Sequence, residues 1–199
     1  MKPYWFRLVL FFLIAVIGFL IDLSTKNWIF GKMMPPNMEH ADVWWMWIDV
    51  FGFQITLNQG ALFGIGQGKV WLFVIFSLIA LLGILIWMFV QGAKSWFMTI
   101  VFGMICSGIL GNLYDRMGLH GLVWENGERV YAVRDWLLVM IGSYHWPNFN
   151  IADSFLVTGA ILLGIYVFLF SEQDSKDKKS ESPEDQNLQD NDSIPEQNQ

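Results

Sequence analysis

Two aspartates stand at the ends of long uncharged stretches, where a carboxylate could do chemistry at a membrane surface. Asp115 follows the uncharged residues 95–114, and Asp153 precedes residues 154–171. A carboxylate in that position is costly unless it is paired, hydrogen-bonded or used in a reaction. Each aspartate also has a structural interpretation, because Asp153 could cap a helix N-terminus and Asp115 could form an ion pair with Arg116.

Three short polar motifs accompany these aspartates. They occupy residues 58–64, 111–116 and 149–153, and they read N-Q-G-A-L-F-G, G-N-L-Y-D-R and F-N-I-A-D. The amides of Asn58, Asn112 and Asn150 can orient a carboxylate or a peptide backbone. Gly60 and Ala61 allow a peptide backbone to approach closely. An ordinary turn is the structural alternative for the first motif.

Together with the Asp22-x-x-x-Lys26 spacing at the end of the first apolar stretch, these motifs resemble those of the lipoprotein signal peptidases, or type II signal peptidases. The family's patterns look like N-x-G-A-x-F, G-N-L-x-D-R and F-N-x-A-D, in the same order along the chain. The resemblance covers residues 5–170, and the combination is far more specific than any single motif.

The resemblance implies a membrane aspartyl protease that works without a metal or cofactor. Its substrate would be a prolipoprotein, cut just before a diacylglyceryl-modified cysteine so that the signal peptide is released. Asp153, the last residue of F-N-I-A-D, matches one catalytic aspartate of the family. By the same resemblance, the residues that bind substrate or orient the catalytic pair are Asn58, Gly60, Asn112, Arg116 and Asn150.

The family's second catalytic aspartate lies in a G-x-V-x-D-F pattern, from which this chain departs. An ungapped match to G-L-V-W-E at residues 121–125 selects Glu125. A gapped match selects Asp135, which is followed by an aromatic residue, Trp136, as in the family. A plain ion pair between Asp135 and Arg134 is the structural alternative.

The dipeptide Asn126-Gly127 between β-prone flanks favours Asp135, because it predicts a hairpin with a two-residue turn. In that register Val123 faces Val130, and Asp135 returns to the level at which the third apolar stretch ends. Glu125, at the hairpin tip, is seven residues beyond Gly118 at the end of that stretch. At about 3.3 Å per residue it would lie roughly 23 Å from Gly118. We therefore predict Asp135 as the second catalytic carboxylate.

Two close carboxylates cannot both ionise easily, so such a pair shares one proton. The ionised member can take a proton from the attacking water, while the protonated member polarises the scissile carbonyl and later serves the leaving amine. The pair titrates as a unit, and the sequence does not decide which aspartate begins as the base.

The elements that must position these residues are membrane helices. Of the 199 residues, 54% are hydrophobic and only 15% are charged, against roughly 25% charged in a soluble domain. Four apolar stretches suit a hydrocarbon layer of about 30 Å. We expect one domain at residues 1–170, with spans at about 5–24, 70–92, 95–115 and 153–171. The first stretch also has the length of a signal-peptide core, but no small-x-small cleavage site follows it.

Two long segments, about 24–69 and 116–152, connect these spans on one side. Residues 43–48 and 53–57 are rich in aromatic and β-branched types, which favours strands or a belt at the interface. The predicted fold class is therefore membrane α-helical, with four transmembrane helices and a small extracytoplasmic β-rich cradle that includes the hairpin.

Basic residues next to the spans favour cytoplasmic termini and a site near the outer leaflet. With the resemblance, the expected location is the bacterial cytoplasmic (inner) membrane, with membrane lipid as a partner. Residues 171–199 contain nine acidic residues and three lysines, which accounts for the whole net charge of −6. We expect this acidic segment to be a disordered cytoplasmic tail. Without a basic patch, nucleic acid binding is not expected.

Other classes of function find less support. Cys106 is the single cysteine, and the three histidines lack the spacing of a helical metal site. A proton-coupled transporter should carry a charge in the middle of a span, and the long spans have none. A non-catalytic scaffold is a further alternative, but it has no reason to collect asparagines and aspartates on one face. A serine hydrolase built on Ser143 and His145 would lack a nucleophile elbow.

Overall fold

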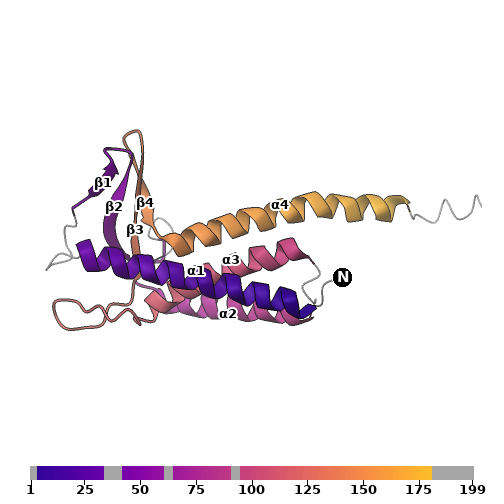
Figure 1. Ribbon diagram of the computed structural model, residues 1–199, viewed down its shortest axis with the longest axis horizontal. Coiled ribbons are helices and arrows are strands. Elements are labelled where there is room, and N and C mark those ends of the chain that lie inside the picture. The colour runs from indigo at the N-terminus through magenta and orange to yellow at the C-terminus, as the bar shows by residue number, and fades with distance from the viewer. Residues whose placement is uncertain (1–3, 34–41, 61–64, 91–94, 181–199) are drawn as a thin grey trace, which may run out of the picture. The chain divides into compact units, whose positions relative to one another are not determined.

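The computed structural model describes residues 4–33, 42–60, 65–90 and 95–180, with side chains described as far as Leu169. The elements are α1 (Tyr4–Met33), β1 (Trp44–Trp47), β2 (Phe51–Asn58), α2 (Val70–Val90), α3 (Trp96–Arg116), β3 (Val133–Ile141), β4 (Tyr144–Phe149) and α4 (Ile151–Ser180). Residues up to Ala160 form one compact unit, and the rest of α4 belongs to a second unit. Within the first unit, α1, α2 and α3 run side by side, and the strands lie at the end of these helices that is away from the N-terminus (Figure 1).

Among the described residues, four helices are long and apolar enough to cross a membrane, which confirms the predicted fold class. The starts of α2, α3 and α4 lie close to the predicted ones. The helix α4 continues to Ser180, into the segment expected to be a disordered tail, because no glycine or proline precedes Pro183 there. The remaining tail residues, 181–199, lie outside the described residues.

The helix α1 is longer than predicted and continues to Met33, well past residue 24. The sequence suggested that the span ends where Asp22 and Lys26 appear. Both side chains are fully buried, however, and they form an i,i+4 ion pair of 2.6 Å. Because the two charges neutralise each other on the packed face, they do not end the helix. That face has helical spacing and comprises Phe11, Ala15, Gly18, Asp22, Lys26, Ile29 and Phe30.

The helix α3 lies at the centre of the first unit. Of its most apolar window 61% is buried, against 22% for α1 and 11% for α2. Glycines bring its neighbours close: a Cβ at Gly103 would meet Ile14 of α1 at 3.0 Å, and one at Gly108 would meet Leu156 of α4 at 2.6 Å. Small residues at such crossings let helices pack tightly in a membrane, where apolar burial alone does not drive association.

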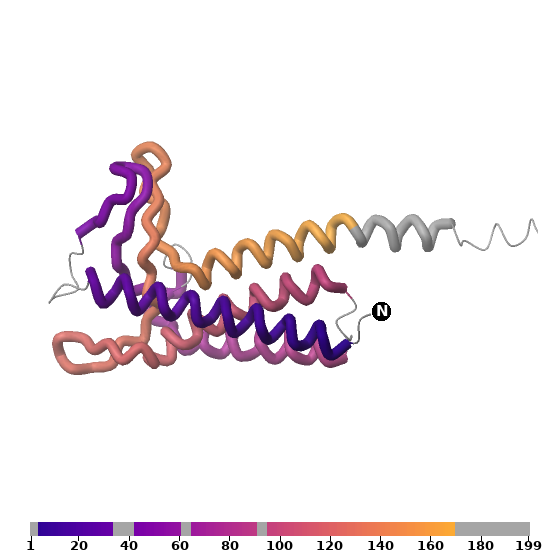
Figure 2. The backbone as a smooth tube through the Cα atoms, in the orientation of Figure 1, coloured from indigo at the N-terminus to yellow at the C-terminus, as the bar shows by residue number. Residues whose placement is uncertain are grey.

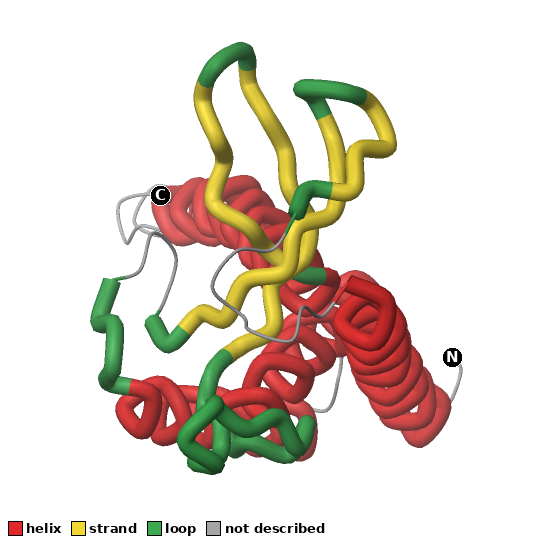
Figure 3. Tube along the Cα trace, turned by 90° about the vertical axis from the view of Figure 1, so that its left-hand side faces the viewer, coloured by secondary structure: helices red, strands yellow, loops and turns green. Residues whose placement is uncertain are grey.

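The strands form one antiparallel sheet in the order β1-β2-β3-β4, and its two hairpins are visible in Figure 3. Strands β1 and β2 confirm the prediction for residues 43–48 and 53–57. Strands β3 and β4 were not predicted. Residues 133–138 of β3 are buried at every position, so the alternation that marks a half-buried strand is missing. Gly142, with φ 62°, occupies the first position of the two-residue turn before β4.

An apolar cluster attaches the sheet to the end of α1. Ile29 and Phe30 of α1 pack with Ile55 of β2 and with Trp136 and Leu137 of β3. Burying aromatic and aliphatic side chains of this size contributes about 1.5–3 kcal/mol each. The cluster therefore fixes the strand that carries the residue just before Trp136, the predicted catalytic aspartate.

The segment between α3 and β3 forms a hairpin beyond the same end of the helices (Figure 2), but in a different register from the predicted one. Val123 bridges Arg129 rather than Val130. The Trp124 N–H donates to the Glu128 carbonyl at 2.8 Å, which leaves three residues in the turn. The predicted two-residue turn was wrong because such turns need a positive φ at their first residue, and of the pair 126–127 only the second residue, Gly127 (φ 82°), has one.

Replacing Gly108 by alanine should destabilise the helix packing. The added Cβ would overlap the Ala152 carbonyl and Leu156 of α4, and overpacking of this kind costs about 1–3 kcal/mol. Gly83→Ala in α2 is the matched control, because a Cβ there meets nothing within 4 Å and alanine gains up to about 1 kcal/mol in helix propensity. Denaturant titration in detergent micelles measures both variants, and equal stability of the two would contradict the proposed close packing.

Candidate active site

Asp135 lies on β3, opposite Thr56 of β2, and is only 2% exposed. Its two carboxylate oxygens accept hydrogen bonds from different elements. Asn58 Nδ2, at the end of β2, donates to Oδ2 at 3.1 Å, and Asn150 Nδ2, just before α4, donates to Oδ1 at 2.6 Å. These two amides hold the carboxylate in a fixed orientation without neutralising its charge.

Asp153 lies in the first turn of α4 and forms a reciprocal cap with Asn150. The Asn150 N–H donates to Asp153 Oδ2 at 3.1 Å, and the Asp153 N–H donates to Asn150 Oδ1 at 2.9 Å. The capping interpretation drawn from the sequence is therefore correct. Capping occupies only one carboxylate oxygen, because Oδ1 accepts a separate hydrogen bond from Asn112 Nδ2 at 2.7 Å.

Asn150 connects the two carboxylates. Its backbone N–H bonds to Asp153, its side-chain amide bonds to Asp135, and the same amide also donates to Asn112 Oδ1 at 3.1 Å. The side chain is fully buried, so these bonds face no competition from water. Two aspartates from different elements thus lie on either side of one asparagine.

Burial raises the pKa of Asp135 well above the ordinary value for an aspartate, and the negative charge of Asp153 raises it further. The hydrogen bonds from Asn58 and Asn150 act in the opposite direction, because they stabilise the ionised form. The Asp135 carboxyl therefore stays protonated at pH values where an exposed aspartate is ionised. Two neighbouring carboxyl groups that share a proton can supply both a general acid and a general base.

Arg116, the last residue of α3, reaches the same site. Its Nη2 donates to the Gly60 carbonyl at 3.0 Å, and its guanidinium lies 5.1 Å from the ring centre of Phe73 in α2. The Gly60 N–H in turn donates to Asn58 Oδ1 at 2.9 Å, which forms an Asx-type turn. The turn interpretation of residues 58–60 is thus correct, and this turn lines the site. Residues 61–64 of the same motif lie outside the described residues.

Behind the two aspartates, four charged side chains are buried together: Asp22, Lys26, Asp115 and Arg134. Lys26 Nζ lies 2.6 Å from Asp22 Oδ2 and 3.2 Å from Asp115 Oδ2. Arg134 donates to Asp115 Oδ1 through Nε at 3.0 Å and through Nη2 at 2.8 Å. Its backbone N–H adds a bond to Asp115 Oδ2 at 3.0 Å. The group, called the ionic cluster below, contains two positive and two negative charges, and their mutual attraction offsets the cost of desolvation.

Two ion pairs considered from the sequence are contradicted by this cluster. Asp115 pairs with Arg134 and Lys26 rather than with its neighbour Arg116. Arg134 pairs with Asp115 rather than with its neighbour Asp135. Successive side chains of a strand point to opposite faces, so Arg134 and Asp135 are directed away from each other.

Hydrogen bonds join the ionic cluster to the candidate catalytic pair. Lys26 Nζ donates to Asn112 Oδ1 at 3.2 Å, and Asn112 donates to Asp153. Asp22 Oδ1 accepts a bond from the Ala152 N–H at 2.9 Å, in the first turn of α4. A network of side chains therefore fixes α1, α3, β3 and the start of α4 around one point.

All seven residues that the sequence selected for the site come together here: Asp135, Asp153, Asn58, Gly60, Asn112, Arg116 and Asn150. Glu125, the alternative to Asp135, is exposed in the hairpin turn. Asp135 reaches the site through its pairing with β2, not through the hairpin register on which the prediction relied.

The sequence reasoning missed three supporting residues. Lys26 was noted only as part of a motif, although a charged pair spaced i,i+4 in an apolar helix is a usable signal. Arg134 carried no signal of its pairing with Asp115. Neither did Asn27, whose Oδ1 accepts a bond from Arg134 Nη1 at 2.6 Å.

Comparison with known proteins decides the family. Residues 14–169 match the family described as signal peptidase (SPase) II. The chain belongs to the signal peptidase II family. The similarity predicted from its motifs is thereby confirmed.

Individual relatives of the signal peptidase II family agree. A lipoprotein signal peptidase of Rhodopirellula baltica is 42% identical over 169 residues, which cover 81% of this chain and 73% of the relative. One of Clostridium novyi is 34% identical over 156 residues, covering 78% and 95%. Two bacterial membrane enzymes solved by the in meso method, at 2.3 Å and 1.9 Å resolution, superpose with TM-scores of 0.63 and 0.61 at 29% and 31% identity. They cover 86% and 78% of this chain, and 90% of each solved chain is matched.

Removing Arg134 should destabilise the protein strongly. Arg134→Met leaves a net negative charge buried in the ionic cluster, and breaking a buried ion pair in this way costs about 3–5 kcal/mol. The control is Arg129→Met in the exposed hairpin, where the change should stay within about 0.5 kcal/mol. The free energy of unfolding in detergent micelles measures both. Similar values for the two variants would show that the cluster does not stabilise the fold.

Proposed function

We propose that this member of the signal peptidase II family is a membrane-embedded aspartic endopeptidase that removes the signal peptide from lipid-modified prolipoproteins. It cuts the peptide bond that precedes the diacylglyceryl-modified cysteine, a reaction for which two carboxyl groups and one water suffice. The observation that carries the proposal is Asn150, which bonds Asp135 through its side chain and Asp153 through its backbone. The names of the relatives agree with this substrate class.

In the proposed mechanism, Asp135 and Asp153 share one proton. The raised pKa of Asp135 favours the state in which Asp135 carries it. The ionised carboxylate takes a proton from water as the water oxygen bonds to the scissile carbonyl carbon. The protonated carboxyl donates its proton to the carbonyl oxygen as this oxygen becomes negative. When the tetrahedral intermediate collapses, the C–N bond breaks and the cysteine amine receives a proton from the carboxyl of the Asp135/Asp153 dyad that had taken it from water. The carbonyl re-forms as its hydroxyl returns a proton to the other carboxylate. The dyad then again holds one proton.

The other residues of the site would position the dyad and the substrate. Asn112 and Asn150 hold the two carboxylates through bonds of 2.7 Å and 2.6 Å. Asn58 orients Asp135 as well, because it donates to the other carboxylate oxygen, Oδ2. Arg116 already binds one backbone carbonyl, that of Gly60, and its guanidinium has further N–H donors for a peptide carbonyl of the substrate.

We place the enzyme in the bacterial inner membrane with both termini in the cytoplasm and the site near the outer leaflet. The N-terminus and the sheet lie at opposite ends of α1 (Figure 1). A cytoplasmic N-terminus therefore directs the sheet, Asp135 and the start of α4 outward. With four spans, the acidic C-terminal segment beyond residue 170 returns to the cytoplasmic side.

Asp135→Asn and Asp153→Asn should each abolish cleavage. An amide keeps the shape of the side chain but does not transfer the proton, and general acid or base catalysis contributes about 10²- to 10⁴-fold. Release of the signal peptide from a purified lipidated prolipoprotein measures the rate.

The matched control for both variants is Glu125→Gln, an amide substitution in the exposed hairpin turn. It should keep nearly full activity. If Glu125→Gln were inactive while Asp135→Asn cleaved at the wild-type rate, the assignment of the second carboxylate would have to be reversed.

Asn58→Ala should move the alkaline limb of the pH profile to higher pH. Activity falls as the pH rises through the raised pKa of Asp135, because the dyad then loses its shared proton. The Asn58 hydrogen bond lowers that pKa, so removing the bond raises it. The dependence of kcat/KM on pH reports the limb for the free enzyme.

The control for the pH profile is Asn148→Ala, because Asn148 bonds the Gln54 carbonyl on the sheet and does not contact the dyad. Its alkaline limb should coincide with that of the wild type. A limb that moves to lower pH in Asn58→Ala would contradict the assignment of this limb to Asp135.

A further inference from the structure

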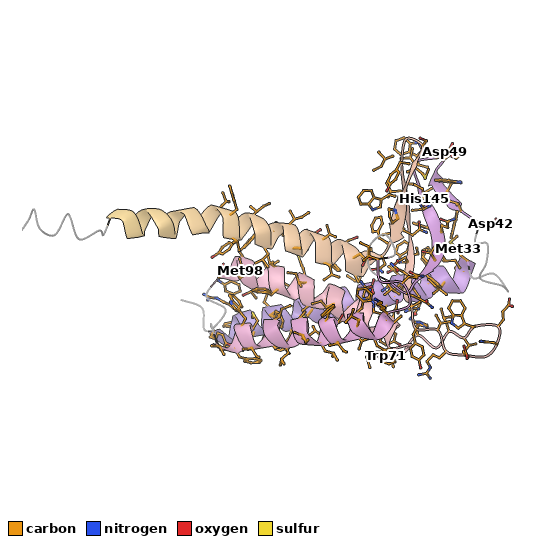
Figure 4. All side chains as sticks on the ribbon, turned by 180° about the vertical axis from the view of Figure 1, so that it is seen from behind. Met33, Asp42, Asp49, Trp71, Met98 and His145 are labelled. Atoms are coloured by element: carbon orange, nitrogen blue, oxygen red, sulfur yellow. The ribbon has the colours of Figure 1, made fainter. Side chains whose placement is uncertain are left out.

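A cavity of about 510 Å³ lies between the hairpin that precedes β3 and the start of α2. We call it the hairpin cavity. Its lining includes Gln59, Trp71, Trp124, Glu128, Arg129 and Tyr131. Trp71 lies at the sheet end of α2, whereas Met98 marks the opposite end of the neighbouring helix α3 (Figure 4). The volume is in the range of small-ligand sites. Neither the two aspartates of the dyad nor the asparagines that bond them are among its lining residues.

The wall of the hairpin cavity is continuous with the proposed active site. Gln59 lines the cavity, and its two chain neighbours are Asn58, which bonds Asp135, and Gly60, which accepts a bond from Arg116. Consecutive Cα atoms are about 3.8 Å apart. A peptide that lies against Asn58 and Gly60 therefore has the wall of the cavity one residue away along the chain.

The chemistry of the lining fits a short stretch of peptide. Trp71 and Tyr131 form a pair with ring centres 5.7 Å apart, and Trp124 adds a third aromatic side chain. Aromatic faces bind bulky side chains, and the Gln59 amide can bond a peptide backbone. Glu128 and Arg129 add one negative and one positive charge to the lining. Covering these charges with an acyl chain would cost free energy of desolvation.

We propose that the hairpin cavity binds the first residues of the mature lipoprotein, those that follow the lipid-modified cysteine. This inference rests on the proposed function, since it concerns the product side of the same cleavage. The mature part must leave the dyad toward water, and the cavity has its charged residues at the exposed hairpin. The hairpin would thus make cleavage depend on residues two to four after the cut.

The test compares two lipidated prolipoproteins that share the signal peptide and the cysteine. One has a tryptophan within residues two to four of the mature part, and the other has only glycines there. The wild type should cleave the tryptophan substrate with a kcat/KM about threefold to tenfold higher, as expected for aromatic contacts of this kind. Cleavage of the glycine substrate tests the proposed function by itself.

Trp124→Ala and Trp71→Ala, which alter two different elements, should each abolish the preference and cleave the glycine substrate at the wild-type rate. The matched control is Trp47→Ala on β1, an exposed tryptophan that does not line the cavity. This control should keep the preference. Two variants are used because a hairpin that fails to form in Trp124→Ala leaves Trp71→Ala as an independent measurement.

Three results would overturn the inference. The preference could persist in both cavity variants, or the variants could lose both substrates to the same extent, which would make the hairpin a structural support. Alternatively, the assay can be run in vesicles of phosphatidylethanolamine and in vesicles of phosphatidylglycerol. The change in kcat/KM caused by the variants could then depend on the lipid and not on the substrate. The cavity would then be a headgroup site. Failure of the wild type to cleave the glycine substrate would instead reject the proposed function.

Discussion

The burial of Lys26 between Asp22 and Asp115 is the interaction on which the site depends. Lys26 lies on α1, Asp115 ends α3, and Arg134 closes the group from β3. A charge that deep is tolerated only when a partner of opposite sign is held beside it. The ends of two helices and one strand are therefore confined to positions at which all four charges balance. Asp135 follows Arg134 directly on β3, and Asp153 follows Ala152, whose N–H bonds Asp22 at the start of α4.

From this cluster, amide side chains extend the positioning to the proposed dyad. Asn112 accepts from Lys26 and donates to Asp153, and Asn150 donates to both Asn112 and Asp135. The two carboxylate oxygens of Asp153 have different roles. Oδ2 caps α4 together with Asn150, and Oδ1 accepts a hydrogen bond from Asn112. Stability of the helix end and orientation of the carboxylate thus come from one set of bonds.

Close helix packing is the second requirement. A Cβ at Gly111 would overlap the Asp22 carboxylate and meet Ala152 at 3.0 Å, so glycine at this position admits both α1 and the start of α4. The motif G-N-L-Y-D-R thereby combines a packing residue, an amide, a member of the ionic cluster and Arg116. Its spacing follows the helix, since Gly111 and Asp115 are four residues apart and lie on one face.

The sequence by itself determined the four apolar spans, the two motif aspartates and the amides around them, because span length and motif spacing are local properties of the chain. Only the tertiary structure decided between Glu125 and Asp135 as the neighbour of Asp153. The predicted hairpin register was wrong by one residue, and β3, which carries Asp135, showed no alternation because both of its faces are buried. The partners of Asp115 were also undecidable, since Arg134 and Lys26 come from other elements and their pairing depends on how strand and helices meet. Local patterns in the sequence therefore identify which residues can contribute to the site. Which of the charged residues pair with one another depends on how their charges balance once they are buried.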